Sequence, residues 1–236
     1  MRRENWRRRC ADYRHFEAVL SSLRRLPGSC DGNECRRSRL MAGRVTTQNV
    51  VLMGRSAVTR EELPFRVIHT RVMFANPVLE VSLDQIVNRQ GQQGEWTIVT
   101  AADGVAVVPV HADGSVTLIR QYRHAIGQWS WEIPAGRQEA GETKEATARR
   151  ELIEEAGLMA RVVEPLLSLF PLNGFCRHSV HLMRGTDLVS VAPRHETFEE
   201  IEVHRLPMAE IQRMIRAGEI RCGIALSALA AIGSNI

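Results

Sequence analysis

The chain has 236 residues, of which 44% are hydrophobic and 25% are charged, a composition typical of a globular protein. This length can bury a sizeable core, and it excludes a peptide, a collagen-like fibre and a fully disordered chain. Because no apolar run reaches the roughly 18 to 20 residues of a membrane span, we expect neither an integral membrane protein nor a membrane partner.

The net charge of +4 is unevenly distributed along the chain. Residues 1–40 hold eleven arginines and five acidic residues, a net of +6, so the other 196 residues sum to −2. Because the excess positive charge lies in residues 1–40 and not in the folded body, it is only weak support for a nucleic-acid partner. We therefore predict a basic N-terminal extension over residues 1–45, either flexible or docking on an anionic surface. Met41 is an alternative start.

One short amphipathic helix is predicted within this extension, because Phe16, Val19, Leu20 and Leu23 follow helical spacing before Pro27. The five cysteines include no CxxC pair with a matching His or Cys pair, so the sequence predicts no zinc site. This usage suits a reducing compartment, and the N-terminus lacks the apolar run of a secretory signal. We expect a cytoplasmic protein.

Residues 46–100 form a β-rich segment, with partial alternation in residues 65–73 and 78–83 and a further strand at 96–99. The polar stretch from Asn88 to Gly94 predicts a turn. An antiparallel unit of about 50 residues is marginal by itself, so we expect it to pack on the next domain or on a second subunit.

Residues 101–236 carry the main fold. A hairpin turn at His111-Ala112-Asp113-Gly114 follows a buried strand, and a helix beginning at Thr143 ends at Gly157. Mixed strands with a few helices predict the α/β class, with a sheet sandwiched between helices. We expect strands at residues 104–110, 115–122, 131–134, 162–170, 179–183 and 201–206, and helices at residues 143–156, 208–217 and 224–232.

The predicted helix at 143–156 carries an acidic cluster. Spacings of three and four residues place Glu151, Glu154 and Glu155 close together on one face. Like charges at this spacing repel, and Arg149 and Arg150 offset part of the repulsion. A divalent cation would turn the repulsion into coordination, because hard cations such as Mg²⁺ prefer carboxylate oxygens.

The order of residues around this cluster is more specific than its charge. Gly136, five residues, Glu142 and seven residues precede the sequence Arg150-Glu151-Leu152-Ile153-Glu154-Glu155-Ala156-Gly157-Leu158. This order matches the Nudix box at every defining position, so the chain resembles a Nudix hydrolase over at least residues 101–236. The resemblance implies an α/β/α sandwich with a mixed sheet, here preceded by the small antiparallel β subdomain of residues 46–100.

The family hydrolyses a diphosphate linked to another group, and the resemblance assigns roles to individual residues. Glu151 and Glu155 are the expected ligands of Mg²⁺, or of Mn²⁺, and the backbone carbonyl of Ala135 is a further expected ligand. Glu154 is expected to bind the metal or to orient the attacking water. Arg150 can pair with the neighbouring carboxylates and hold them in register.

The flanks of the box look like those of the ADP-ribose pyrophosphatase branch. These flanks are Gln121-Tyr122-Arg123 and the stretch from Trp131 to Gly136, which includes Glu132. Arg123 can contact a phosphate through two parallel hydrogen bonds, and its alternative is a structural arginine. Trp96 lies near the position of an adenine-stacking aromatic in that branch, and its alternative is core packing. We take Arg123, Trp96 and Glu132 as candidate substrate-binding residues.

One loop departs from that branch, which tends to carry a Pro-Gly pair followed by serine and acidic residues. Here Asn173 replaces the proline, and Arg177 and His178 replace acids. Another nucleoside-diphosphate sugar, or a different diphosphate, is therefore compatible with the sequence. Arg177 is either a ligand for a terminal phosphate or a solvated loop residue.

A catalytic base is expected from the acidic loop that precedes residues 201–203. In that branch such a loop supplies an acidic residue to the metal site or to the attacking water. Alignment on Ile201-Glu202-Val203 favours Glu199, with Glu196 and Glu200 as alternatives. A carboxylate near Mg²⁺ stays ionised and can accept the proton of the water.

Three functions follow from the sequence. The first is Mg²⁺-dependent hydrolysis of ADP-ribose or a related nucleotide sugar, giving a nucleoside monophosphate and a sugar phosphate. The second is another Nudix activity, on a dinucleotide polyphosphate, NADH or a modified nucleotide. The third is a sensor that binds nucleotide sugars without hydrolysing them. The resemblance also implies a homodimer, in which the β-rich segment contributes to the shared substrate pocket.

Overall fold

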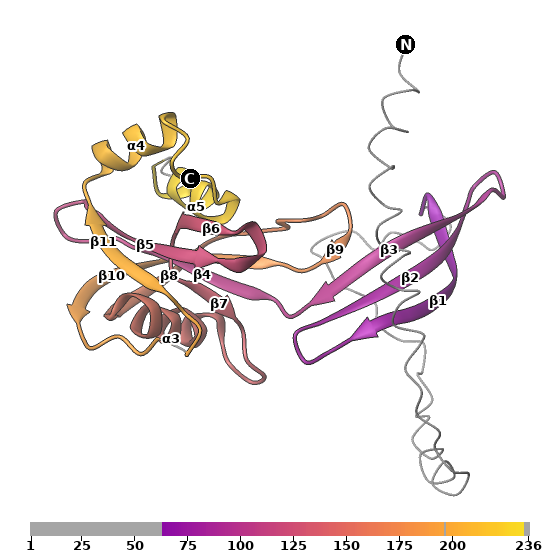
Figure 1. The fold of residues 1–236 in the computed structure, drawn as a ribbon, viewed down its shortest axis with the longest axis horizontal. Helices are drawn as coiled ribbons and strands as arrows, with labels where there is room; N and C mark the ends of the chain where they lie inside the picture. Colours follow the sequence, from indigo (N-terminus) through magenta and orange to yellow (C-terminus); the bar gives the residue numbers. More distant parts are fainter. Residues whose placement is uncertain (1–62, 196, 234–236) are drawn as a thin grey trace, which may run out of the picture. The chain divides into compact units, whose positions relative to one another are not determined.

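The computed structural model describes residues 63–195 and 197–233 of the chain (Figure 1). The helix predicted around Phe16 and the candidate base Glu196 lie outside these residues. Among the described helices, none has the length and apolar character needed to cross a membrane.

An antiparallel sheet opens the described part of the chain, as predicted. Asn88 organises the turn between its second and third strands by accepting hydrogen bonds from the backbone N–H groups of Gln90 and Gln92 at 3.0 and 2.9 Å. The sheet order is β1-β2-β3-β9, and β9 runs parallel to β3. Its strands are β1 (Phe65–Ala75), β2 (Leu79–Asn88), β3 (Gln93–Ala101) and β9 (Cys176–Arg177).

Two further sheets form the body of the fold. One is mixed, in the order β7-β4-β10-β8, with β4 and β10 parallel. The other is antiparallel, in the order β11-β5-β6. Their strands are β4 (Gly104–Pro109), β5 (Val116–Arg123), β6 (Gln128–Glu132), β7 (Ala135–Arg137), β8 (Leu158–Leu169), β10 (Val180–Ser190) and β11 (Ile201–Leu206).

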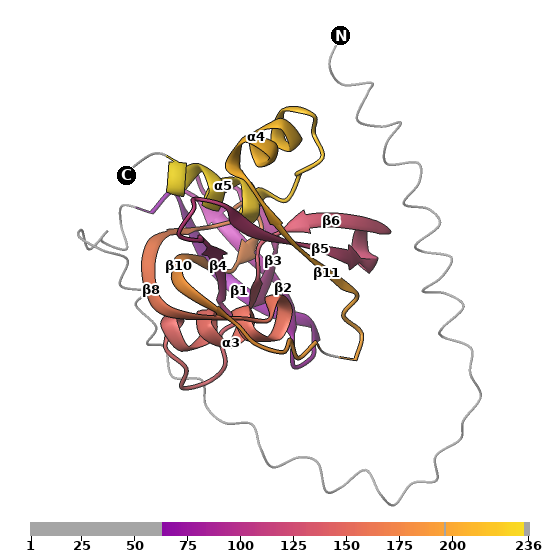
Figure 2. The ribbon, with the colours of Figure 1, turned by 90° about the vertical axis from the view of Figure 1, so that its left-hand side faces the viewer.

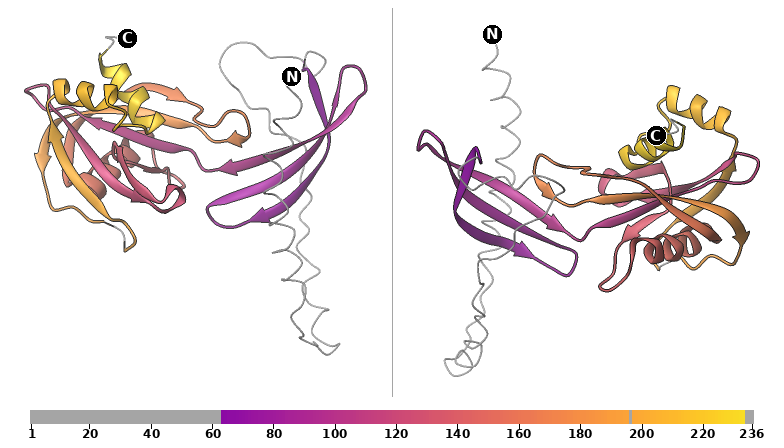
Figure 3. Two further views of the ribbon diagram at one scale, coloured as in Figure 1. Left: turned by 45° about the horizontal axis from the view of Figure 1, so that its top comes forward. Right: turned by 180° about the vertical axis from the view of Figure 1, so that it is seen from behind.

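Helices cover the two faces of these sheets, with α3 (Lys144–Ala156) opposite α4 (Met208–Arg216) and α5 (Gly223–Gly233) (Figures 2 and 3). The alternation of β4 explains the two layers. Val105 and Val107 pack with α3, whereas Ala106 and Val108 pack with α4 and α5. Since successive side chains of a strand point to opposite faces, a fully apolar strand such as β4 requires cover on both. The predicted α/β/α sandwich is confirmed.

The limits of α3 are those predicted, and local chemistry explains both. The Thr143 hydroxyl accepts a hydrogen bond from the Ala146 backbone N–H at 3.1 Å, which caps the first turn. Gly157 ends the helix with a φ of 60°, and its N–H donates to the carbonyls of Leu152 and Ile153. A Cβ at Gly157 would lie 2.8 Å from the Val191 carbonyl oxygen, so the close approach also requires glycine.

Several strand limits differ from the predictions. β8 begins at Leu158 instead of residue 162, and β10 continues to Ser190 instead of ending at residue 183. The two strands pair over their whole length, across a register shift near Pro165, so cross-strand hydrogen bonds extend them beyond their apolar cores. The strands β7 and β9, with three and two residues, were not predicted, because pairing with β4 and β3 alone defines them.

Candidate active site

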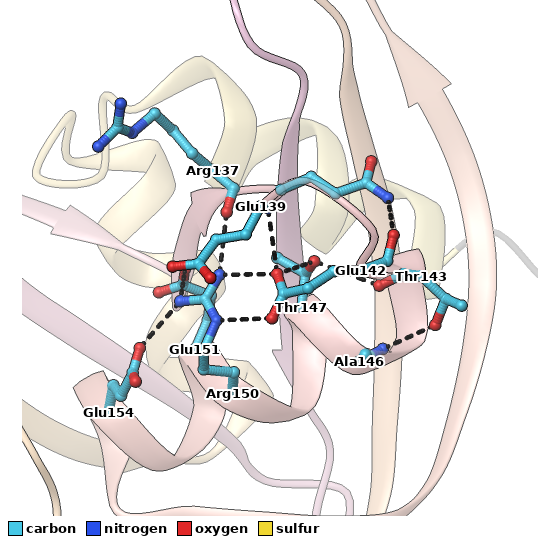
Figure 4. A network of polar contacts seen from close by, with 10 residues as sticks. Arg137, Glu139, Glu142, Thr143, Ala146, Thr147, Arg150, Glu151 and Glu154 are labelled. Atoms are coloured by element: carbon cyan, nitrogen blue, oxygen red, sulfur yellow. Dashed lines mark hydrogen bonds and ion pairs between the residues drawn. The ribbon is translucent and has the colours of Figure 1, made fainter. Parts of the chain in front are cut away.

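Arg150 organises the acidic face of α3 (Figure 4). Its guanidinium donates to both oxygens of Glu142, at 3.0 and 3.1 Å, and to the carboxylates of Glu151 and Glu154 at 2.6 and 2.9 Å. It also donates to the Arg137 carbonyl at 2.9 Å. These bonds hold the pKa of Glu142 down at about 2. One arginine thus ties the loop before α3 to two of the three helix carboxylates.

Glu155 lies deeper, and a different group holds it. Its side chain accepts a hydrogen bond from the Ala135 backbone N–H at 2.8 Å, and the residue is only 2% exposed. Burial, with a smaller contribution from the nearby carboxylates of Glu151 and Glu199, raises the pKa of Glu155 to about 8 against the opposing effect of the hydrogen bond from Ala135. Burial also raises the pKa of Glu151. Negative charge is therefore costly here unless a cation accompanies it.

Gly136 lies directly against the Glu151 carboxylate. A Cβ at this position would overlap the carboxylate atoms of Glu151, so only glycine leaves Glu151 in its present place. Glu151 is itself 7% exposed, which limits its freedom to move aside. Gly136 therefore leaves the space that the Glu151 carboxylate occupies.

A cavity of about 500 Å³ lies between these elements. Five carboxylates and the substrate-binding candidate Arg123 line it, and they come from the loop before α3, from α3 itself, from the loop before β11 and from the end of β5. The sequence-predicted residues in its wall are Arg123, Ala135, Glu151, Glu154, Glu155 and Glu199. Side chains from positions as far apart as Arg123 and Glu199 thus line one cavity, as expected of a concave ligand site.

Arg123 and Glu132 form a pair at the edge of this cavity. The Arg123 Nε and Nη2 atoms donate to the two carboxylate oxygens of Glu132 at 3.0 and 2.7 Å. The Arg123 side chain is 42% exposed and that of Glu132 is 11% exposed. Glu132 therefore contacts the arginine, which faces the cavity, and does not itself line the cavity wall.

The other candidates lie elsewhere. Trp96 is not among the lining residues. Its ring is edge-on to Phe65 with centroids 5.7 Å apart, and its indole N–H donates to the Gly174 carbonyl at 3.3 Å. Glu200 is exposed, and its backbone carbonyl accepts the Tyr122 N–H at 3.2 Å. Of the two candidate bases that the structure describes, Glu199 and Glu200, it brings Glu199 into the cavity with the helix carboxylates.

The donor set is suited to a hard cation. Within the described ranges, no three His, Cys, Asp or Glu side chains lie close enough together to form a complete metal site. Glu151 accepts a hydrogen bond from Arg150, and Glu155 accepts one from Ala135. Their oxygens are nevertheless the type of ligand that divalent cations prefer, and they share a cavity with the three further carboxylates of Glu139, Glu154 and Glu199. The residues present therefore fit a divalent metal.

Arg177 makes an ion pair that the sequence did not predict. It donates to a carboxylate oxygen of Asp84 at 3.0 Å, and the Thr70 hydroxyl donates to the other oxygen at 2.6 Å. The Asp84 side chain is 5% exposed, whereas that of Arg177 is 60% exposed. The pair links β9 to β2, and the sequence had no signal for a contact across 93 positions.

We expect Arg177→Ala to destabilise the fold by about 1–2 kcal/mol, because it leaves one oxygen of a buried carboxylate without a donor. Urea unfolding measures the change. Arg184→Ala is the matched control, since it removes an arginine from an ion pair with Glu164 whose side chains are 44% and 49% exposed. The control is expected to cost about 0.5 kcal/mol or less. Equal losses in both variants would contradict a structural role for the Asp84 pair.

A protein family, sequence relatives and a solved structure all match this chain. Residues 100–221 match the NUDIX domain family. The chain is 32% identical to an ADP-ribose pyrophosphatase of Mycobacterium tuberculosis over 174 residues, covering 72% of this chain and 84% of the relative. It is 31% identical to the ADP-sugar pyrophosphatase of Mus musculus over 172 residues, covering 67% and 76%. A solved ADP compounds hydrolase shares the fold with a TM-score of 0.65 at 19% identity, covering 72% of this chain and 93% of that one.

Proposed function

Since the chain belongs to the NUDIX domain family and is a Nudix hydrolase, we propose that it hydrolyses the diphosphate of ADP-ribose or a related nucleoside-diphosphate sugar. The products are a nucleoside monophosphate and a sugar phosphate. The observation that carries the proposal is the cavity in which Glu151, Glu154, Glu155 and Glu199 share a wall with Arg123. The printed activities of the bacterial and mouse relatives support this substrate class.

Nudix hydrolases generally use divalent metal ions, and we propose Mg²⁺, with Mn²⁺ as a substitute. Glu151 and Glu155 would hold the ion, with the Ala135 carbonyl and Glu199 as further ligands. Such an ion neutralises phosphate charge and lowers the pKa of a bound water. The raised pKa of Glu155 supports this assignment, because burial and the neighbouring carboxylates of Glu151 and Glu199 outweigh the attraction of Arg123, so a cation would stabilise the ionised form.

The side chains of the protein bind the substrate and move the proton. Arg123 binds a phosphate oxygen with the donors that it does not share with Glu132, which holds the guanidinium in place. The water oxygen forms a bond to one phosphorus, and the bridging oxygen leaves with the other phosphate. Glu199 accepts the proton of the water, and Glu154 orients it. Glu196 and Glu200 are the alternative bases.

A panel of diphosphates tests this proposal. Purified protein with MgCl₂ is expected to hydrolyse ADP-ribose or another nucleotide sugar faster than a dinucleotide polyphosphate, NADH or an oxidised nucleoside triphosphate. EDTA is expected to stop turnover, and added Mg²⁺ or Mn²⁺ to restore it. Preference for a compound outside the nucleotide sugars would reassign the substrate, and folded protein inactive on every diphosphate would leave the binding-only role.

We further propose a homodimer formed through the sheet of β1 to β3. All eleven residues of β1 are exposed in the single chain. Val72, Met73 and Phe74 are 54%, 55% and 54% exposed, an apolar surface that a second copy would cover. A small sheet with an exposed edge strand gains stability from such a partner.

Light scattering after gel filtration is expected to give twice the 26.6 kDa of one chain. Phe74→Glu is expected to give a monomer, because it places a charge in the apolar contact. Val162→Glu, at a residue of β8 that is 43% exposed, is the matched control and should leave the mass unchanged. A wild-type monomer would exclude the proposed dimer.

A further inference from the structure

The segment between β10 and β11 is fixed to the C-terminal end of α3. The Val191 N–H donates to the Gly157 carbonyl at 2.9 Å, and the Arg194 N–H donates to the Glu154 carbonyl at 3.1 Å. The His195 Nε2 atom lies 3.2 Å from the Glu155 carbonyl oxygen. His195 lies four positions before Glu199 in the sequence.

These contacts satisfy backbone carbonyls at the C-terminal end of α3. The last carbonyls of an α-helix have no partner within the helix, so another group must satisfy them. Here the carbonyls of Glu154 and Glu155 receive Arg194 and His195. Because a carbonyl oxygen only accepts, the contact requires a proton on Nε2 of His195. The residues that supply two active-site carboxylates thus also supply two attachment points for the loop.

The loop is attached again on its other side. The Glu200 carbonyl accepts the Tyr122 N–H at 3.2 Å, and Ile201 then pairs with Gln121 at the start of β11. Glu199 lies between these two attachments in the sequence, at His195 and at Glu200, and it also lies in the wall of the cavity that Glu151 and Glu155 line. A short span held at both ends restricts where its carboxylate can be.

We propose that His195 is a positioning residue that sets the location of Glu199 through its hydrogen bond to the Glu155 carbonyl. The inference rests on the proposed function, because Glu199 acts there as the proton acceptor. It assigns His195 no contact with substrate. The sequence analysis did not identify this residue, since nothing local marks a side chain that caps a helix 40 positions earlier.

Variants at position 195 test the hydrogen bond with the full chain, ADP-ribose and MgCl₂. His195→Ala is expected to lower kcat roughly 10-fold with KM unchanged, because a displaced base slows the chemical step. His195→Gln can place a donor at the same position and is expected to recover most of kcat. His111→Ala, which removes a 2.8 Å contact with Thr117 beyond the far end of β4, is the matched control.

A double-mutant cycle separates positioning from general support of the fold. Glu199→Gln alone is expected to lower kcat roughly 100-fold. In that background, His195→Ala is expected to cause no further loss, since its effect acts through Glu199. Equal losses from His195→Ala in both backgrounds, or full activity of Glu199→Gln, overturns the inference. His195→Phe replaces the alanine variant if thermal unfolding shows that alanine prevents folding. Wild-type inactivity on every nucleotide sugar contradicts the proposed function instead.

Discussion

Replacing Glu155 by glutamine is expected to lower kcat roughly 1,000-fold while the protein stays folded. Glutamine keeps the shape of the side chain, and its carbonyl oxygen can still accept the hydrogen bond that Ala135 donates to Glu155 at 2.8 Å. It removes the negative charge that we propose holds the divalent cation. Steady-state kinetics with saturating Mg²⁺ measures the loss.

The stability of this variant has a predicted sign. Burial raises the pKa of Glu155 to about 8, so the ionised side chain is unfavourable in the metal-free protein. We therefore expect the melting temperature of Glu155→Gln without metal to equal or exceed that of the wild type. Glu210→Gln, on the exposed surface of α4, is the control and should retain full turnover. Turnover of Glu155→Gln within about threefold of the wild type would falsify the role assigned to this carboxylate.

Gly136→Ala is the second substitution with a large expected effect. The added Cβ would overlap the Glu151 carboxylate, which accepts a hydrogen bond from Arg150 at 2.6 Å. The carboxylate end of a side chain can move more easily than the backbone, so the fold is expected to survive. The displaced Glu151 can no longer act with Glu155, and kcat is expected to fall roughly 100-fold or more.

Circular dichroism and kinetics together test this expectation. Gly223→Ala is the matched control, because no atom lies within 4 Å of its added Cβ and its backbone does not require glycine. The control should keep wild-type turnover and stability. Two results would contradict the argument: an unfolded Gly136→Ala protein, or one that retains full activity.

Local signals in the sequence were sufficient for the fold class and for most elements. Thr143 and Gly157 define the two ends of α3 through short-range hydrogen bonds, so its limits could be read directly. The alternation that predicts β1 and the fully buried β4 is likewise local. The strands β7 and β9 exist only through pairing with distant segments, and no short-range pattern marks them.

In the candidate site too, local sequence spacing predicts some residues, whereas only tertiary packing reveals others. Helical spacing alone places Glu151, Glu154 and Glu155 together, because they lie three and four residues apart on α3. Position in the sequence favoured Glu199 without excluding Glu200, whereas the structure brings Glu199 to the cavity and leaves Glu200 exposed. Pairs such as Arg177 with Asp84 depend on tertiary packing, so residue type and spacing could not reveal them.

The most direct test is a crystal structure of the protein soaked with MnCl₂, with anomalous diffraction used to locate manganese. The account predicts a manganese ion within about 2.3 Å of carboxylate oxygens from both Glu151 and Glu155. A folded protein with these side chains apart and no ion between them, while the same preparation hydrolyses nucleotide sugars, would contradict it.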